Sequence, residues 1–221
     1  MAVPERFRTI GGEPTGARLL LVRHGEAVCN VRGIVGGPRG CSGLSERGRT
    51  QAVALGRRLG ASGELADVAA AYVSPLPRAL ETARLVGQHV GGLPTPLVEP
   101  GLEELRPGQA DGLTWEEMVA RFGGPDWDAE PDAPLAPGGE SWLEFGVRCR
   151  DVLMSLARRH EGQRVVAFTH AGVVEHALRL VIPTPPGARL GLRTAHCAMT
   201  EVEVDGSRCR LLRYNDVAPV V

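Results

Sequence analysis

Arginine and histidine side chains recur where apolar, strand-like segments of this chain end. Arg23 and His24 close the first such segment, just before a glycine. Arg78 follows the second segment, and His170 closes the third. Guanidinium donors bind phosphate oxygens in pairs, and a neutral imidazole can attack phosphorus without a separate base. These residue types therefore indicate phosphoryl transfer, a reaction that needs mainly positioning and positive charge.

The three apolar segments would bring those side chains together. Residues 18–24, 67–73 and 164–169 are short runs rich in aliphatic side chains, which is typical of strands buried in a parallel sheet. Ligands of open α/β sheets bind beyond the carboxyl ends of such strands. We therefore expect the basic side chains named above to meet at that edge of the sheet.

Helical patterns alternate with these segments. Apolar side chains recur at helical spacing after Ser45, a typical N-cap residue, and after Pro77, which suits the start of a helix. The expected helices cover residues 45–59, 77–90, 141–160 and 171–180. A hairpin around an Asp-Gly turn is expected from residues 198–204 and 209–214. The sequence thus predicts a three-layer α/β fold, with a mostly parallel sheet and helices on both of its faces.

Composition bounds the class of protein. The chain has 221 residues, 43% of them hydrophobic, and a formal net charge of -1. This composition suits one domain over residues 1–221 with a large buried core. Acids and arginines are interspersed, so we expect no nucleic-acid partner. No apolar run is long enough to span a membrane, and residues 1–16 lack the pattern of a signal peptide. Both features predict a cytoplasmic protein without membrane contact.

Cysteine and lysine usage removes several chemistries. The chain has five cysteines, an odd number without a Cys-x-x-Cys pair, so reduced thiols are expected. It contains no lysine, which excludes Schiff-base, pyridoxal-phosphate and P-loop chemistry. A zinc or iron site would have to use His24, His170 and an acid, and no His-Glu-x-x-His spacing supports such a site. We therefore expect neither a metal nor another cofactor.

Further motifs follow in order along the chain. Asn30 comes soon after His24, a Leu-Glu-Glu segment ends at Glu104, and Asp-Gly and Gly-Gly-Glu-Ser segments come later. With the strand ends, this order resembles the histidine phosphatase superfamily, also called the phosphoglycerate mutase-like family. The resemblance extends over about residues 19–216. It implies the phosphoglycerate mutase-like fold and a reaction through a phosphohistidine intermediate.

The resemblance assigns roles to individual side chains. It implies that His24 is the nucleophile, that Glu104 is the general acid, and that His170 is a further catalytic residue that donates to the phosphoryl oxygens. The residues that it implies for phosphate binding are Arg23, Arg78, Asn30 and Ala171, the last through its backbone N–H. Ala171 stands where the family usually has glycine, a change that a backbone donor tolerates. Glu103 and Asp111 remain alternatives to Glu104 as the acid.

Two loop segments are expected to shape the pocket. Residues 106–140 are rich in glycine, proline and acids, and we interpret them as an irregular lid or as a surface insertion anchored by its tryptophans. A glycine-rich loop before the first long helix carries Gly37, Arg39 and Ser42, which we predict to line the substrate pocket. The resemblance places His196 near the site, and its role stays open.

These observations predict a phosphatase that acts on a small phosphorylated metabolite. Transfer of the phosphoglycerate mutase type is the alternative, and an inactive binding module of the same fold is a third possibility. A mutase would need extra cations to bind a carboxylate and a second phosphate, whereas most of the charged side chains in residues 106–140 are acidic. The physiological substrate and the oligomeric state stay open, with a homodimer among the options.

Overall fold

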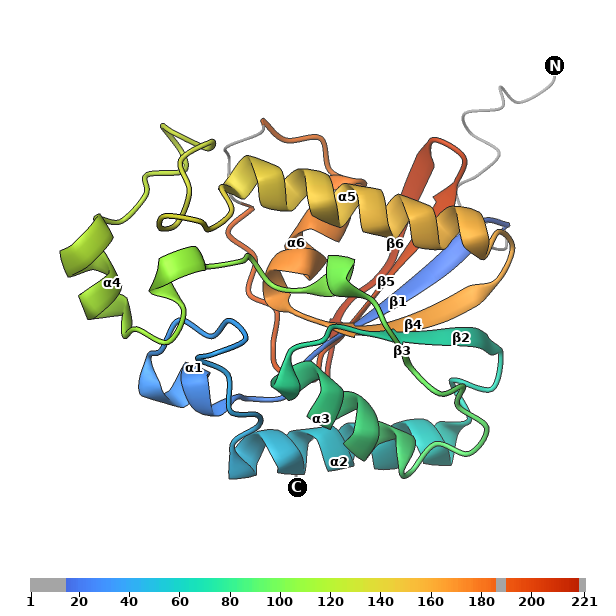
Figure 1. Ribbon diagram of the computed structural model, residues 1–221. Helices are drawn as coiled ribbons and strands as arrows, with labels where there is room; N and C mark the ends of the chain where they lie inside the picture. Colours follow the sequence, from blue (N-terminus) through green and yellow to red (C-terminus); the bar gives the residue numbers. More distant parts are fainter. Residues whose placement is uncertain (1–14, 186–189, 219–221) are drawn as a thin grey trace, which may run out of the picture.

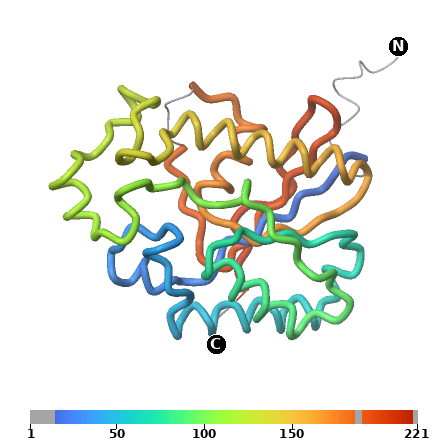
Figure 2. Tube along the Cα trace, in the orientation of Figure 1, coloured from blue at the N-terminus to red at the C-terminus, as the bar shows by residue number. Residues whose placement is uncertain are grey.

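A computed structural model of the protein describes residues 15–185 and 190–218 (Figures 1 and 2). The described residues form one sheet of six strands in the order β3-β2-β4-β1-β5-β6. Their bounds are β1 Ala17–Arg23, β2 Val68–Val73, β3 Leu97–Val98, β4 Arg164–Thr169, β5 Met199–Asp205 and β6 Arg208–Asp216. The first four strands pair in parallel, whereas β5 and β6 add an antiparallel edge. The mostly parallel sheet is therefore confirmed.

Helices cover both faces of this sheet (Figure 1). The α-helices in the described residues are α1 Val28–Arg32, α2 Glu46–Ser62, α3 Pro77–Gly87, α4 Trp115–Phe122, α5 Trp142–Arg159 and α6 Ala171–Arg179. Two short 3-10 helices are η2 Pro100–Leu102 and η3 Gly108–Ala110. α2 and α3 pack on one face of the sheet, and α5 and α6 pack on the other. This is the predicted three-layer α/β arrangement.

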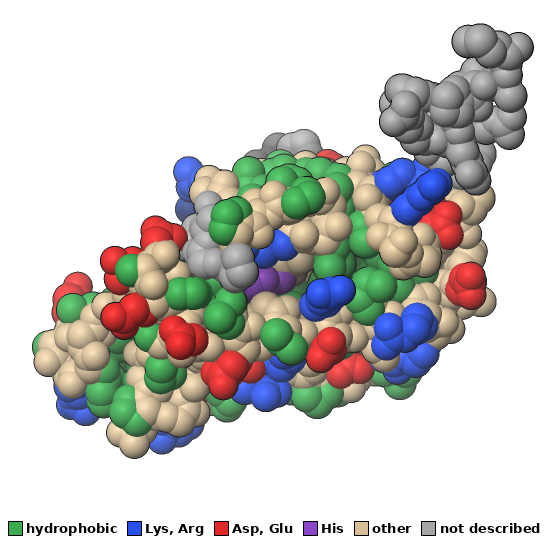
Figure 3. All heavy atoms as spheres, turned by 90° about the horizontal axis from the view of Figure 1, so that it is seen from above, with side chains coloured by type: hydrophobic (Ala, Val, Ile, Leu, Met, Phe, Trp, Pro, Cys, Tyr) green, Lys and Arg blue, Asp and Glu red, His purple; other side chains and the backbone are tan. Residues whose placement is uncertain are grey.

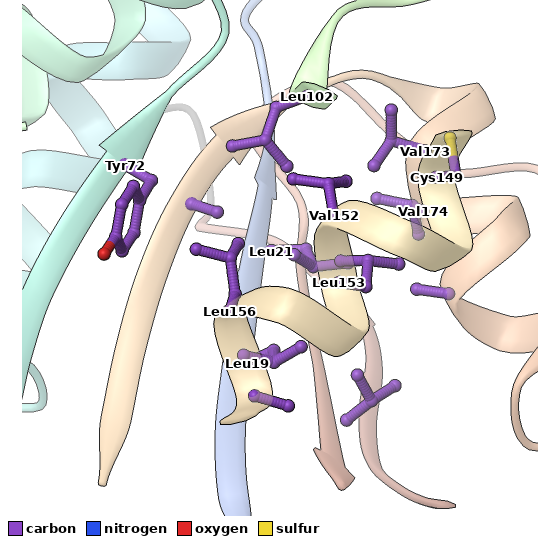
Figure 4. Packing of buried hydrophobic residues seen from close by; sticks show 14 of the residues in the cluster. Leu19, Leu21, Tyr72, Leu102, Cys149, Val152, Leu153, Leu156, Val173 and Val174 are labelled. Atoms are coloured by element: carbon purple, nitrogen blue, oxygen red, sulfur yellow. The ribbon is translucent and has the colours of Figure 1, made fainter. Parts of the chain in front are cut away.

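Successive side chains of β1 alternate between two hydrophobic cores, one on each face of the sheet. Leu19 and Leu21 belong to the core beneath α5 and α6, which Figure 4 shows from close by. Leu20 and Val22 belong to the core on the side of α2 and α3. Each of these four side chains is at most 1% exposed. Because a central parallel strand is buried on both faces, an uninterrupted apolar run forms β1 and holds the residues that follow it in place.

Two helices begin where the sequence predicts. Ser45 caps α2, and its hydroxyl accepts a hydrogen bond from the N–H of Gly48 at 3.0 Å. Ser141 caps α5 in the same way, within a capping box. α2 runs past its predicted end to Ser62, and the left-handed backbone of Gly63 (φ 65°) terminates it. α3 is shorter than predicted and ends at Gly87.

Three short elements depart from the predicted layout. α1 lies in the glycine-rich loop after β1, β3 has only 2 residues, and α4 lies inside the segment 106–140. The expectation that this segment is irregular is therefore wrong for Trp115–Phe122. Thr114 and Glu117 form a capping box at the start of α4, and this Thr-x-x-Glu signal is visible in the sequence. The predicted hairpin is confirmed as β5 and β6.

Three further expectations concern location and redox state. None of the described helices is both long and apolar enough to cross a membrane. The five cysteines are free thiols. The signal-peptide expectation concerns residues 1–16, of which residues 1–14 lie outside the described part of the chain.

Candidate active site

The carboxyl ends of β1, β2 and β4 bring the predicted basic side chains together. His24 follows β1, Arg78 lies in the first turn of α3 after β2, and His170 is the N-cap residue of α6 after β4. β1 and β4 are neighbours, with Arg23 opposite Thr169. The imidazole centroids of His24 and His170 lie 5.1 Å apart. Adjacent parallel strands thus deliver residues that are far apart in the sequence to one place.

Hydrogen bonds define the state of the His24 ring. Its Nδ1 lies 2.6 Å from the carbonyl oxygen of Gly25. Because a carbonyl oxygen only accepts hydrogen bonds, Nδ1 carries the proton and Nε2 carries the lone pair. Nε2 accepts a hydrogen bond from Nε of Arg78 at 3.1 Å. Burial, and after it the charges of Arg78 and Arg23, hold the pKa of His24 well below 6.5. The ring is therefore neutral and its Nε2 is nucleophilic.

Two guanidinium groups flank His24. Arg78 is 4% exposed and donates from Nη1 to the carbonyl oxygen of Gly36 at 2.7 Å. Arg23 donates to the carbonyl oxygen of Thr194, and its buried Nε has no hydrogen-bond partner among the described residues. Both arginines line the same cavity as His24. Positive charge is therefore concentrated around Nε2 of His24, where a phosphoryl group would gain most from it.

His170 is fully buried beside His24. Its Nε2 lies 2.7 Å from Oγ of Ser74, and its buried Nδ1 has no hydrogen-bond partner in the described part of the chain. Burial, followed by the charge of Arg78, holds the pKa of His170 well below 6.5. Ala171 begins α6 and lines the cavity. Because the first N–H groups of a helix lack intrahelical partners, this helix end can bind an anion.

Glu104 is an acid that reaches the cavity. Its carboxylate oxygens accept hydrogen bonds from the N–H groups of Leu105 and Gly172, each at 3.2 Å. A Cβ atom at position 172 would lie 2.2 Å from Oε1 of Glu104 and 2.6 Å from Cε1 of the buried Phe145 ring, so glycine leaves room there for both side chains. Gly172 could not be predicted as a site residue, because no local pattern relates it to an acid that far away in the sequence.

The two alternative acids lie in other surroundings. Glu103 pairs with Arg106 at 2.7 Å and does not line the cavity. Asp111 accepts hydrogen bonds from backbone N–H groups of the loop 37–40 at 2.8 to 2.9 Å. It does not line the cavity either. The geometry therefore favours Glu104 over both.

The glycine-rich loop carries the three residues that are predicted to line the substrate pocket. The structure does not bring Gly37, Arg39 and Ser42 to the wall of the cavity. The hydrogen bonds to Asp111 tie this part of the loop to the segment 106–140, and the Arg39 side chain remains 70% exposed. Ser42 is exposed as well. In this loop, the cavity is lined instead by Ile34, Val35 and Gly36.

Two other predicted positions lie close to His24. Asn30 lines the cavity, and its Oδ1 accepts a hydrogen bond from the N–H of Ala27 at 3.0 Å, which closes the first turn of α1. The ring centroid of His196 lies 5.7 Å from that of His24, but its side chain lines a neighbouring cavity of about 390 Å³. Burial, followed by the charge of Arg23, lowers the pKa of His196 to about 4. His196 is therefore a neutral neighbour of the site.

A partly buried ion pair holds the backbone next to Glu104. Arg148 of α5 donates to the carbonyl oxygens of Gly101 and Glu103 at 2.9 Å and of Glu104 at 3.2 Å. Its guanidinium group also donates to both carboxylate oxygens of Glu140, at 2.7 and 2.6 Å. Glu140 belongs to the Gly-Gly-Glu-Ser motif, which thereby gains a structural role. Arg148 belongs to no motif and was therefore not predicted.

The cavity has a volume of about 440 Å³ and lies between the strand ends and the segment 106–140. A backbone hydrogen bond from Gly112 to Val35, at 3.0 Å, joins this segment to the glycine-rich loop. The rings of Trp127 and Trp142 stack with centroids 5.6 Å apart. Figure 3 shows histidine atoms at the surface among apolar side chains, with acidic side chains gathered towards one end of the molecule. The segment 106–140 therefore forms the outer wall of the cavity.

Known proteins are similar to this chain in sequence. A model of the histidine phosphatase superfamily (branch 1) matches residues 19–217. A metal-independent phosphoserine phosphatase of Arabidopsis thaliana is 34% identical over 161 residues, which cover 71% of this chain and 65% of that protein. A 2,3-bisphosphoglycerate-dependent phosphoglycerate mutase of Brucella ovis is 35% identical over 141 residues, which cover 59% of this chain and 63% of that protein. The chain thus spans slightly less than two thirds of the length of these curated relatives.

A solved structure gives the same fold. Mycobacterial glucosyl-3-phosphoglycerate phosphatase matches with a TM-score of 0.74 and 27% sequence identity. The match covers 90% of this chain and 99% of that chain.

Proposed function

The chain belongs to the histidine phosphatase superfamily, and we propose that it is a phosphatase that hydrolyses a small phosphomonoester through a phosphohistidine on His24. The observation that carries this proposal is the neutral imidazole of His24, whose Nε2 contacts Arg78 and shares a cavity with Arg23. A phosphoserine phosphatase and a glucosyl-3-phosphoglycerate phosphatase among the similar proteins support the same class of reaction.

His24 supplies the nucleophile of the first step. The hydrogen bond from Nδ1 to Gly25 keeps the lone pair on Nε2, which attacks phosphorus in line with the leaving oxygen. Arg23 and Arg78 bind the equatorial oxygens. Nε of Arg78, which contacts His24 in the free protein, then takes a phosphoryl oxygen as its partner. The N–P bond forms as the bond between phosphorus and the alcohol oxygen breaks.

Neighbouring donors stabilise the charge that develops. If the Ser74 hydroxyl donates to Nε2 of His170, Nδ1 of His170 carries the proton and donates to a phosphoryl oxygen. The backbone N–H of Ala171 at the start of α6 donates to the same group. Asn30 lines the same cavity, and we propose that its side chain is a further polar contact of the phosphoryl group.

Glu104 moves the protons. Protonated Glu104 gives its proton to the leaving alkoxide in the first step. In the second step its carboxylate takes a proton from water, and the water oxygen attacks phosphorus as the N–P bond breaks. Phosphate leaves, and His24 and Glu104 return to their starting protonation states.

The charges of the cavity favour hydrolysis over the mutase reaction. Among the described residues that line it, the cations are Arg23 and Arg78, and both are needed for one phosphoryl group. The other charged lining residues are Glu104 and Glu175. A mutase has to hold a carboxylate and a second phosphate as well. An inactive binding module is disfavoured because the nucleophile, the acid and the phosphate-binding arginines are all present.

Several sequence predictions accompany this proposal. We propose that the reaction needs no metal or other cofactor, because arginine, histidine and backbone donors supply the charge stabilisation. We propose that residues 106–140 act as a lid on one domain formed by the whole chain. A cytoplasmic location and a homodimer stay predictions.

Phosphate release from a panel of phosphorylated metabolites tests the proposal. We expect wild-type protein to release phosphate from at least one monoester and to keep this activity after exhaustive chelation. His24→Ala should abolish the release, whereas His89→Ala, which changes an exposed histidine, should leave it intact. The mutase alternative is measured in parallel as conversion of 3-phosphoglycerate to 2-phosphoglycerate with 2,3-bisphosphoglycerate present. Isomerisation faster than phosphate release, or activity restored only by a divalent ion, would contradict the proposal.

A further inference from the structure

The outer wall of the catalytic cavity is apolar and aromatic. Trp115, Trp127 and Leu135 of the segment 106–140 line the cavity, together with Ile34 of the glycine-rich loop. The Trp127 ring is fixed by its hydrogen bond to the carbonyl oxygen of Ala133, at 2.8 Å, and by stacking on Trp142. Trp115 is 50% exposed. Exposed aromatic surface at the mouth of a polar site indicates a contact with an apolar ligand.

The charged lining residues leave no described cation for a second anionic group. Arg23 and Arg78 bind the phosphoryl group in the proposed reaction, and Glu104 serves as its acid. The remaining acid, Glu175, is neutralised by Arg179 at 3.2 Å and accepts a hydrogen bond from the N–H of Leu190. No described lining carboxylate is therefore left unpaired to attract a cationic alcohol.

The charge of the segment 106–140 also disfavours an anionic alcohol part. The segment 106–140 carries many acids outside the cavity, and acidic side chains gather at one end of the molecule in Figure 3. The acids of this segment near α4 are Glu116, Glu117, Asp126, Asp128, Glu130 and Asp132. A substrate with a carboxylate or a second phosphate on its alcohol part would be repelled by this surface.

We infer that the preferred substrates are phosphomonoesters of uncharged, apolar alcohols, and that Trp115 and Trp127 contact the alcohol part. This inference rests on the proposed phosphatase function, because it assigns Arg23 and Arg78 to the phosphoryl group. Trp115 and Trp127 are then specificity-determining residues that the catalytic motifs do not include. Both come from the segment 106–140, so the outer wall selects the alcohol while the strand ends bind the phosphate.

Three esters that all lose a primary alkoxide test the inference. They are ethyl phosphate, 2-phenylethyl phosphate and 3-phosphoglycerate. Because their leaving oxygens are chemically similar, differences in kcat/KM report on the rest of the alcohol. We expect kcat/KM for 2-phenylethyl phosphate to exceed both others by about 10-fold or more, the range that apolar pocket contacts give. A separate pair, phosphocholine and its neutral carbon analogue 3,3-dimethylbutyl phosphate, should show no preference for the cation.

Two variants on α4 test whether Trp115 causes the preference for the apolar ester. Trp115→Ala should lower kcat/KM for 2-phenylethyl phosphate by about 10-fold, with a much smaller loss for ethyl phosphate, and Trp115→Phe should restore most of it. Val119→Ala is the matched control, because Val119 lies on the same helix, is 52% exposed and does not line the cavity. It should change neither substrate.

The outcomes separate this inference from the function on which it rests. Phosphate release from none of the esters would overturn the phosphatase proposal itself. Release at equal rates from ethyl and 2-phenylethyl phosphate, or fastest from 3-phosphoglycerate, would overturn the substrate class alone. Faster release from phosphocholine than from its neutral analogue would do the same. An equal loss for both alkyl esters in Trp115→Ala would remove Trp115 from the specificity role.

Discussion

Glu103 and Glu104 are neighbours in sequence, yet their carboxylates meet different surroundings. Glu104 faces the cavity and accepts the N–H of Gly172 at the start of α6. Glu103 pairs with Arg106 at the surface. The backbone at Glu103 is extended (φ -59°, ψ 154°), so the two neighbouring side chains point to different sides, and Arg148 holds both carbonyl groups. One carboxylate thus has a role in chemistry and the other forms an ion pair.

This difference predicts a leaving-group dependence. Glu104→Gln should slow alkyl phosphate esters by about 10²–10⁴-fold, as expected when a general acid is lost. It should slow p-nitrophenyl phosphate much less, because p-nitrophenolate leaves as a stable anion. Single-turnover rates of the chemical step measure both effects. Glu103→Gln is the matched control and should leave both rates close to wild type; a leaving-group-dependent loss in that variant would identify Glu103 as the acid instead.

At the scale of elements, the contact between α5 and α6 places a histidine in an aromatic interface. The ring centroid of His176 on α6 lies 4.6 Å from the ring centroid of Trp142 and 4.8 Å from that of Phe145. Gly146 makes room for it, since a Cβ atom there would lie 2.9 Å from the ring. Burial, followed by the charge of Arg179, lowers the pKa of His176 to about 4. The helix contact therefore requires a neutral imidazole.

Stability should consequently fall with acid. In the unfolded chain His176 gains a proton below its usual pKa of 6.5, whereas in the folded chain it stays neutral down to about 4. The unfolded state binds more protons in this window, so stability is present above it and is lost as pH falls. We expect His176 to contribute about 2 kcal/mol to the loss in unfolding free energy between about pH 7.5 and pH 5.

Urea unfolding at the two pH values measures this contribution. His176→Gln carries no titrating group and should show a smaller loss than wild type. His89→Gln changes an exposed histidine and should behave as wild type. An unchanged pH dependence in His176→Gln would show that the interface tolerates a charged ring.

The long elements could be predicted from sequence because their signals are local. The buried run of β1 and the Ser45 cap of α2 each depend on neighbouring residues. α1 and β3 are too short to carry such a pattern. α4 carries a capping box at Thr114, but its glycine- and proline-rich flanks obscured it. Local patterns thus gave the sheet and its covering helices, while the short elements near the cavity followed from the folded structure.

At the scale of the whole molecule, contacts between distant segments complete the site. Asp111 binds the loop 37–40, and Arg148 joins Glu140 to the backbone at Glu104. No local pattern relates these residues, so the sequence reveals neither that Asp111 holds the loop of Gly37 and Arg39 nor that Arg148 holds the backbone at Glu104. His24 and Arg78 were predicted because each ends or follows a strand, and parallel strand ends share one edge.

Trapping the phosphoenzyme tests whether His24 is the nucleophile. Wild-type protein mixed with a labelled phosphomonoester and quenched in alkali within one turnover should carry label on the peptide that contains His24. Phosphohistidine is stable in alkali and labile in acid, so brief acid treatment should remove the label. His24→Ala should fold with an unchanged circular dichroism spectrum and carry no label, whereas His89→Ala should be labelled as wild type. Equal labelling of His24→Ala, or label that withstands acid, would contradict the account.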